Sequence, residues 1–150
     1  MTNDQKKPVL IVDGHSMIFQ WPDLAAHHLR NPVAARAELV RILDTLRDNS
    51  GRHVIVVFDG KGVRPNEAGD PGRVQIFYSK AGQTADSIIE RLVAKYGATY
   101  DVTVATDDRL EQTTVATFGG TPMSSEALRN EIADAGRQLA ERIKQLRRAR

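Results

Sequence analysis

The sequence contains no cysteine, which excludes structural disulfides, thiolate nucleophiles and cysteine-ligated zinc or iron–sulfur sites. Any metal that the protein binds must therefore be held by oxygen or imidazole ligands. Long apolar runs are also absent, since the longest, Val54 to Phe58, is far shorter than the 18 or more residues of a membrane span. The polar start, Met1 to Lys7, is followed by no apolar signal-peptide core. We expect a cytoplasmic protein.

The composition is typical of one globular domain that folds by burial alone. The chain has 150 residues, of which 41% are hydrophobic and 27% are charged. Its net charge of +2 is unevenly distributed, because residues 137–150 hold six basic residues and one acid, which leaves −3 for the rest. We interpret residues 1–7 as disordered, 8–136 as the folded domain and 137–150 as a basic helical extension. Such an extension suits a polyanion such as RNA, but a basic terminal helix is more often simply a solvated face.

Apolar β-branched runs alternate along the chain with stretches of helical periodicity, without internal repeats. The runs predict strands at residues 9–12, 54–58, 74–78 and 102–106. Capping residues and apolar spacing predict helices at residues 32–48 and 84–96, and two more that begin near residues 109 and 124. We interpret the segments at residues 14–30 and 61–72 as loops, and Gly119-Gly120 as a turn. This alternation predicts an α/β fold with a mostly parallel sheet, which binds ligands beyond the carboxyl ends of its strands.

Aspartate directly follows three of the predicted strands, as Asp13, Asp59 and the pair Asp107-Asp108. A parallel sheet brings such strand ends to one edge, where repulsion between the carboxylates is relieved by a cation or by raised pKa values. Mg²⁺ or Mn²⁺ prefers carboxylate and water oxygens and commonly binds phosphates as further ligands. The pattern therefore favours phosphodiester hydrolysis by a water that the metal activates. The alternative for Asp13 and Asp59 is that Asp-Gly is a common turn dipeptide.

A fourth aspartate, Asp86, lies near the start of the predicted helix at residues 84–96, and Glu90 follows one turn later on the same face. Both side chains could point toward the same crevice as the strand-end acids. The alternative is that Asp86 only favours the positive end of its helix and that Glu90 is solvated. The residues alone leave both interpretations open.

Four segments resemble the YacP-like branch of the NYN domains, which belong to the PIN-like metal-dependent nucleases: VLIVDGHS at residues 9–16, VIVVFDG at 54–60, GQTADSIIER at 82–91 and VATDDRLEQ at 104–112. The resemblance extends in order over residues 8 to about 135. It implies a PIN-like three-layer α/β/α sandwich with a central, mostly parallel sheet. It also implies an endoribonuclease that hydrolyses single-stranded RNA with Mg²⁺ or Mn²⁺, and that cuts messenger RNA in association with the ribosome.

By the family motifs, Asp13, Asp86 and Asp108 correspond to metal ligands, and Asp107 is a further candidate ligand where a small polar residue is usual. Asp59 corresponds to the acid after the second strand, as a ligand or as an organiser of the site. The first motif departs from the usual Asp-Gly-Tyr-Asn, because His15 and Ser16 replace its last two residues. Substrate contacts are expected from Ser16, Lys80 and Arg109, and as weaker candidates from Lys61 and Arg64.

Two other interpretations remain open on the sequence alone. The first is a non-catalytic module that binds RNA or the ribosome, with His15 and Ser16 as signs of a degenerate nuclease site. The second, a receiver or phosphatase with an acid-rich parallel sheet, does not explain the Thr84-Ala85-Asp86 segment. His15 and Trp21 are candidates for stacking on an unpaired base, although a single tryptophan is more often part of the core. The pair His27-His28 lacks a partner at metal-ligand spacing. The sequence does not indicate an oligomeric state.

Overall fold

The protein is described here from a computed structural model, in which residues 5–60 and 73–149 are placed. Along these residues the elements are β1 (Pro8–Asp13), α1 (Gly14–Gln20), α2 (Pro22–Arg30), α3 (Pro32–Ser50), β2 (His53–Phe58), β3 (Gln75–Tyr78), α4 (Ala85–Tyr96), β4 (Asp101–Ala105), α5 (Arg109–Thr117), β5 (Thr121–Met123) and α6 (Ser125–Arg148). The five strands form one sheet in the order β3-β2-β1-β4-β5, and every neighbouring pair is parallel.

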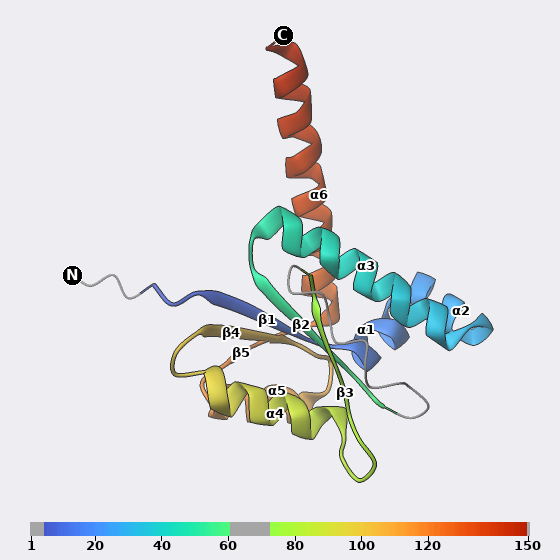
Figure 1. Cartoon of the computed structure of the whole chain (residues 1–150), viewed down its shortest axis with the longest axis vertical. Coiled ribbons are helices and arrows are strands. Elements are labelled where there is room, and N and C mark those ends of the chain that lie inside the picture. Colours follow the sequence, from blue (N-terminus) through green and yellow to red (C-terminus); the bar gives the residue numbers. More distant parts are fainter. Residues whose placement is uncertain (1–4, 61–72, 150) are drawn as a thin grey trace.

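Helices cover both faces of this sheet, which gives three layers (Figure 1). Helices α1, α2, α3 and α6 lie on one face, and α4 and α5 lie on the other. The alternation of side chains along β1 explains why both faces are apolar: Leu10 and Val12 pack under the first group of helices, whereas Val9 and Ile11 pack under the second. The expected α/β/α sandwich with a central parallel sheet is confirmed.

The segment expected to be a loop after β1 is instead two short helices. Asp13 caps α1, and Pro22 occupies the first turn of α2, where proline is tolerated because its missing N–H would have no partner there. Trp21 lies between the two helices, is buried, and donates from Nε1 to the backbone oxygen of Ser125 at 3.1 Å. Trp21 therefore belongs to the core and is not available for stacking on a base.

A second difference is β5, an unpredicted strand that lies between the predicted Gly119-Gly120 turn and the last helix. This strand has only three residues, one of which is Pro122, and it lies at the edge of the sheet. Proline cannot donate to a ladder and is tolerated at an edge, where no further strand needs its N–H. The loop predicted at residues 61–72 lies outside the described residues, as do residues 1–4 of the predicted disordered start.

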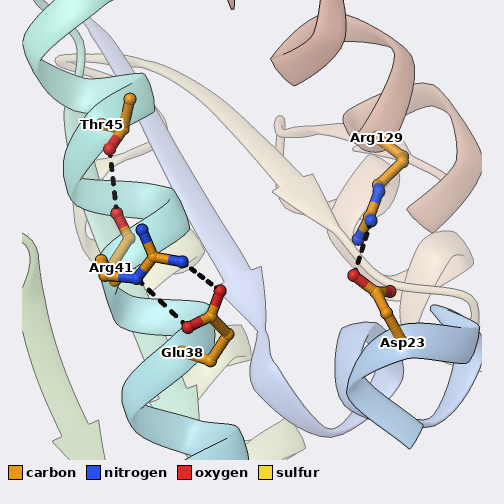
Figure 2. Close-up of polar contacts among 5 residues, drawn as sticks. All are labelled: Asp23, Glu38, Arg41, Thr45 and Arg129. Atoms are coloured by element: carbon orange, nitrogen blue, oxygen red, sulfur yellow. Dashed lines mark hydrogen bonds and ion pairs between the residues drawn. The ribbon is translucent and has the colours of Figure 1, made fainter.

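Polar contacts tie the α1–α2 corner to α6. Arg129 of α6 forms an ion pair with Asp23 of α2 at 2.8 Å (Figure 2). The Arg129 guanidinium also lies 4.6 Å from the centre of the Trp21 ring. On the outer face of α3, Arg41 pairs with Glu38 one turn away, a kind of surface contact that contributes little to stability. The Arg129–Asp23 pair is also at the surface, so the buried Trp21–Ser125 hydrogen bond is the stronger link between this corner and α6.

Helix α6 begins in the core and continues beyond the body of the domain (Figure 1). Leu128 is fully buried and Ile132 packs against the same cluster, whereas Ile143 and Leu146 on the same stripe are exposed. The helix continues through the basic residues as far as Arg148. Among the described residues, no helix is both long and apolar enough to cross a membrane.

Candidate active site at the carboxyl edge of the sheet

The strand-end acids identified in the sequence meet at one edge of the sheet. Strand β1 lies between β2 and β4, and all three run in the same direction. Asp13 ends β1, Asp59 directly follows β2, and Asp107 and Asp108 follow Thr106 after β4. The topology thus gathers acids that are separated by about a hundred positions in the sequence.

Asp13 is the most buried of these acids, with 5% of its surface exposed. Its Oδ2 accepts hydrogen bonds from the Ser16 hydroxyl at 2.8 Å and from the Thr106 hydroxyl at 2.9 Å. The backbone N of Asp107 in turn donates to the Ser16 oxygen at 3.2 Å. These bonds fix the carboxylate between the ends of β1 and β4, so the serine that departs from the family motif positions Asp13.

Asp107 and Asp108 are neighbours in the sequence but do different things. Both oxygens of Asp107 accept hydrogen bonds from Ser125, at 2.7 Å from its N and 2.5 Å from its hydroxyl, at the start of α6. Asp108 caps α5, and its Oδ1 accepts from the N of Leu110 and of Glu111. Within the described part of the chain, the other oxygen of Asp108 accepts no hydrogen bond. Asp108 therefore keeps a free oxygen, and Asp107 keeps none.

Asp59 is exposed and is held by the neighbouring strand end. The Ser79 hydroxyl donates to Asp59 at 3.0 Å and accepts from the N of Gly60 at 2.9 Å. A Cβ on Gly60 would lie 1.6 Å from the backbone oxygen of Ser79, so only glycine allows the ends of β2 and β3 to approach this closely. Glycine is therefore required here by the close approach of two backbones. It is not required by a left-handed conformation, because the φ angle of Gly60 is not positive.

Helices α4 and α5 add carboxyl groups to the same edge. Asp86 lies in the first turn of α4, which begins with a capping box formed by Thr84 and Ser87. Glu90 follows Asp86 by one turn. Burial raises the pKa of Asp86, and the charges of Asp13, Asp108, Glu90 and Asp59 raise it further. The six residues Asp13, Asp59, Asp86, Glu90, Asp108 and Glu111 are called the carboxyl cluster below.

Glu111 of α5 is the member of the cluster that the sequence did not single out. Only 2% of its surface is exposed, and as a carboxylate it has no hydrogen-bond partner for either oxygen. Burial, then the charge of Asp86, then a hydrogen bond that joins its protonated form to Glu90 raise the pKa of Glu111 to about 8. Its place one turn before the apolar Val115 was a signal of inward placement, because residues four apart share a helix face. The sequence also did not single out Thr106, whose hydroxyl donates to Asp13, a residue 93 positions earlier in the chain.

The cluster concentrates negative charge where a cation would relieve it. Within residues 5–60 and 73–149, no three acidic or histidine side chains lie close enough to hold a metal ion by direct ligation. The donors are nevertheless all oxygens, and when Glu111 is ionised both of its buried oxygens lack a hydrogen-bond partner. Mg²⁺ usually keeps several waters and binds through one or two carboxylates, so the residues fit a hydrated divalent cation of this kind. Asp13, Asp86 and Asp108 are the residues that would hold it.

The residues expected to contact substrate are not equivalent in the structure. Ser16 is engaged with Asp13, whereas Lys80 and Arg109 are exposed and form no ion pair with any described residue. Lys80 follows β3 and Arg109 begins α5, so both lie at the same edge as the cluster. Lys61 and Arg64 lie outside the described residues. His27 and His28 belong to α2 and are in no metal-ligating group of the described chain.

Comparisons with known proteins agree on one family. The family model described as YacP-like NYN domain matches residues 10–150. The chain is 30% identical over 142 residues to a protein of Bacillus subtilis (strain 168) named "Uncharacterized protein YacP", and the match covers 92% of this chain and 82% of the relative. The crystal structure of Rae1 (YacP) from Bacillus subtilis is similar with a TM-score of 0.77 at 30% identity, over 92% of this chain and 80% of that one. Its W164L mutant gives a TM-score of 0.80 at 28% identity, over 93% and 83%.

Proposed function

Because the chain belongs to the YacP-like NYN domain family, a family of nuclease type, we propose that it is a metal-dependent endoribonuclease that hydrolyses phosphodiester bonds of single-stranded RNA. The observation that supports this most is the carboxyl cluster, in which burial and mutual repulsion raise the pKa values of Asp86 and Glu111. Unpaired negative charge of this kind is costly to maintain unless the site uses it. A hydrated Mg²⁺ or Mn²⁺ would relieve the repulsion and would bring phosphate oxygens to the same edge.

The proposal gives each group a task. Asp13, Asp86 and Asp108 hold the cation, and Ser16 and Thr106 fix the carboxylate of Asp13. When bound, the cation supplies Lewis-acid polarisation of the phosphodiester and lowers the pKa of the hydrolytic water. Lys80 and Arg109 bind phosphates that flank the scissile bond, where the fork of arginine matches two phosphate oxygens.

The proposed substrate is messenger RNA, engaged in association with the ribosome in the cytoplasm. The basic residues at the end of α6, which include Arg142, Lys144 and Arg147, suit this partner because they are exposed and carry charge opposite to that of RNA. Affinity that depends on these residues should fall steeply with salt, since each phosphate contact releases counterions. Glu141 is the acid among them and lowers the charge by one.

The experiment is cleavage of a labelled single-stranded RNA pool by the purified protein with Mg²⁺, with Mn²⁺ or with chelator, in the presence and absence of ribosomes. Asp86→Asn is the test variant because it removes one charge at constant size. Asp101→Asn is the matched control, since Asp101 is an exposed aspartate at the start of β4, on the opposite edge of the sheet. Cleavage that requires metal and Asp86, but not Asp101, supports the proposal. Absence of cleavage under every condition contradicts it.

A second candidate, a module that binds RNA or the ribosome without cutting, is favoured by one observation. The Ser16 hydroxyl donates a hydrogen bond to Asp13. Within the described chain, no three cluster side chains lie close enough together to ligate one metal ion. The two candidates differ in their response to metal. The enzyme loses turnover but keeps RNA binding in Asp86→Asn, whereas the binding module binds RNA equally well with and without metal and never cuts it.

A further inference from the structure

Three aromatic rings lie in contact with one another on helices α1 and α2, the two helices that follow Asp13. The ring centres of His15 and Phe19 are 4.4 Å apart at an interplanar angle of 45°, and those of Phe19 and His28 are 4.7 Å apart at 65°. His15 and Phe19 are one turn apart on α1, and His28 comes from the neighbouring helix α2. These three residues are called the ring cluster below.

The central residue of the ring cluster is open to solvent, which is unusual for phenylalanine, whereas His28 is half-buried. Phe19 has 46% of its surface exposed although phenylalanine is normally buried, and His15 is also exposed. Trp21, only two residues further along, is by contrast 3% exposed and bonded to the backbone of Ser125. The fold therefore buries one aromatic side chain of this segment and leaves the other beside two imidazole rings at the surface.

The position of the ring cluster connects it to the site. Helix α1 begins directly after Asp13, so the Cα of His15 lies within about 7 Å of the Cα of Asp13 along the chain. Ser16, the next residue, bonds to Asp13 itself. Helix α1, which carries two of the three rings, therefore starts at the carboxyl cluster.

From this geometry we infer that the ring cluster of His15, Phe19 and His28 is a binding subsite for the unpaired base of a nucleotide that adjoins the scissile phosphate. The inference rests on the proposed function and deepens it. Unpaired bases stack on aromatic and histidine rings irrespective of sequence, because every base has a flat π-face. The carboxyl cluster repels phosphates in the absence of a cation, so base stacking supplies affinity that does not depend on metal.

The test measures binding rather than cleavage. A short labelled single-stranded RNA and the same RNA with one base removed at successive positions are titrated with the protein in chelator. We expect Phe19→Ala to weaken binding of the intact RNA about 5- to 150-fold, the range for loss of one base–aromatic stack. Phe19→Leu should bind RNA as weakly as the alanine variant because leucine lacks a π-face. Phe19→Trp keeps a π-face and should bind RNA like the wild type.

The matched control is Phe118→Ala. Phe118 is also a surface phenylalanine, 47% exposed, but it follows α5 and makes no ring contact with any described residue. This variant should bind RNA like the wild type. One abasic position should weaken binding to the wild type and have no effect on Phe19→Ala, since the same stack is lost in either way. His15→Ala repeats the test with a smaller change, and thermal unfolding checks that each variant is folded.

The outcomes separate this inference from the function on which it rests. The inference is overturned if wild type and Phe19→Ala bind intact RNA equally well. It is also overturned if an abasic position weakens RNA binding by the same factor in both proteins. Either result holds even if the protein cuts RNA. Base-dependent binding that Phe19→Ala abolishes supports the inference, and failure to cleave with any metal then contradicts only the proposed enzyme.

Discussion

Replacing Glu111 by glutamine should stabilise the protein, and the gain should grow as the pH rises. The wild-type carboxyl group is buried among other carboxyl groups, so its pKa is about 8 in the folded chain against 4.5 for the free group. A raised pKa means that folding favours the protonated form. Below pH 4.5 this group therefore causes no loss of folding stability. As the pH rises the free energy of unfolding falls, and the loss is complete once the pH has passed about 8.

The size of the effect follows from the same two values. At about 1.36 kcal/mol per pKa unit, the gap between 4.5 and about 8 sets an upper bound of roughly 5 kcal/mol on the linkage. Glutamine cannot ionise and escapes this penalty, but its amide must find hydrogen-bond partners in the same buried place. We therefore expect a net gain of about 1–2 kcal/mol at pH 8 and a much smaller one at pH 5.

The measurement is urea unfolding in chelator at pH 5, 6.5 and 8, followed by the fluorescence of Trp21. This residue is the one tryptophan of the chain and is buried, so its emission reports loss of the core. Glu141→Gln, at an exposed glutamate of α6, controls for the general loss of one negative charge. If the difference between Glu111→Gln and the wild type is the same at pH 5 and pH 8, the assignment of a raised pKa to Glu111 is refuted.

Three further predictions concern the site and its supports. Mg²⁺ or Mn²⁺ should raise the thermal unfolding midpoint of the wild type because it neutralises the carboxyl cluster, and a similar rise in Asp86→Asn would count against the proposed ligand. Asp107→Ala removes two hydrogen bonds to the start of α6 and should cost about 1–2 kcal/mol in urea unfolding while the midpoint shift with metal remains. Gly60→Ala should lower the free energy of unfolding by about 1–3 kcal/mol because its Cβ would meet backbone at 1.6 Å. Gly136→Ala, whose Cβ would meet nothing within 4 Å, should stabilise α6. Equal effects of the two substitutions would contradict the close approach at Gly60.

The sequence predicted the central strands well because they are buried on both faces. Such strands must be apolar at every position, and β-branched runs such as Val54 to Phe58 leave little alternative. It also predicted that Asp13, Asp59 and Asp108 share one edge, because parallel strands end on the same side. Both inferences needed only local composition and the rules for connecting strands.

The elements that the sequence missed are those whose local signal is weak. Helices α1 and α2 have seven and nine residues, too few for a clear apolar period, and they are stabilised by packing of Trp21 and Leu24 in the core. Strand β5 contains Pro122 and is recognisable only by its pairing with β4. In these cases tertiary contacts decide the conformation, and they join residues distant in the sequence.

The sequence by itself determined which groups the site contains: carboxylates at strand ends and no thiols. Only the tertiary structure decided which acids are free. Asp107 and Asp108 are indistinguishable as residue types, yet one is bound to Ser125 and the other keeps an open oxygen. Burial of Glu111 and exposure of Phe19 are likewise set by neighbouring helices. The physical reason is that a residue type fixes which bonds a side chain can make, whereas packing fixes which partners are within reach.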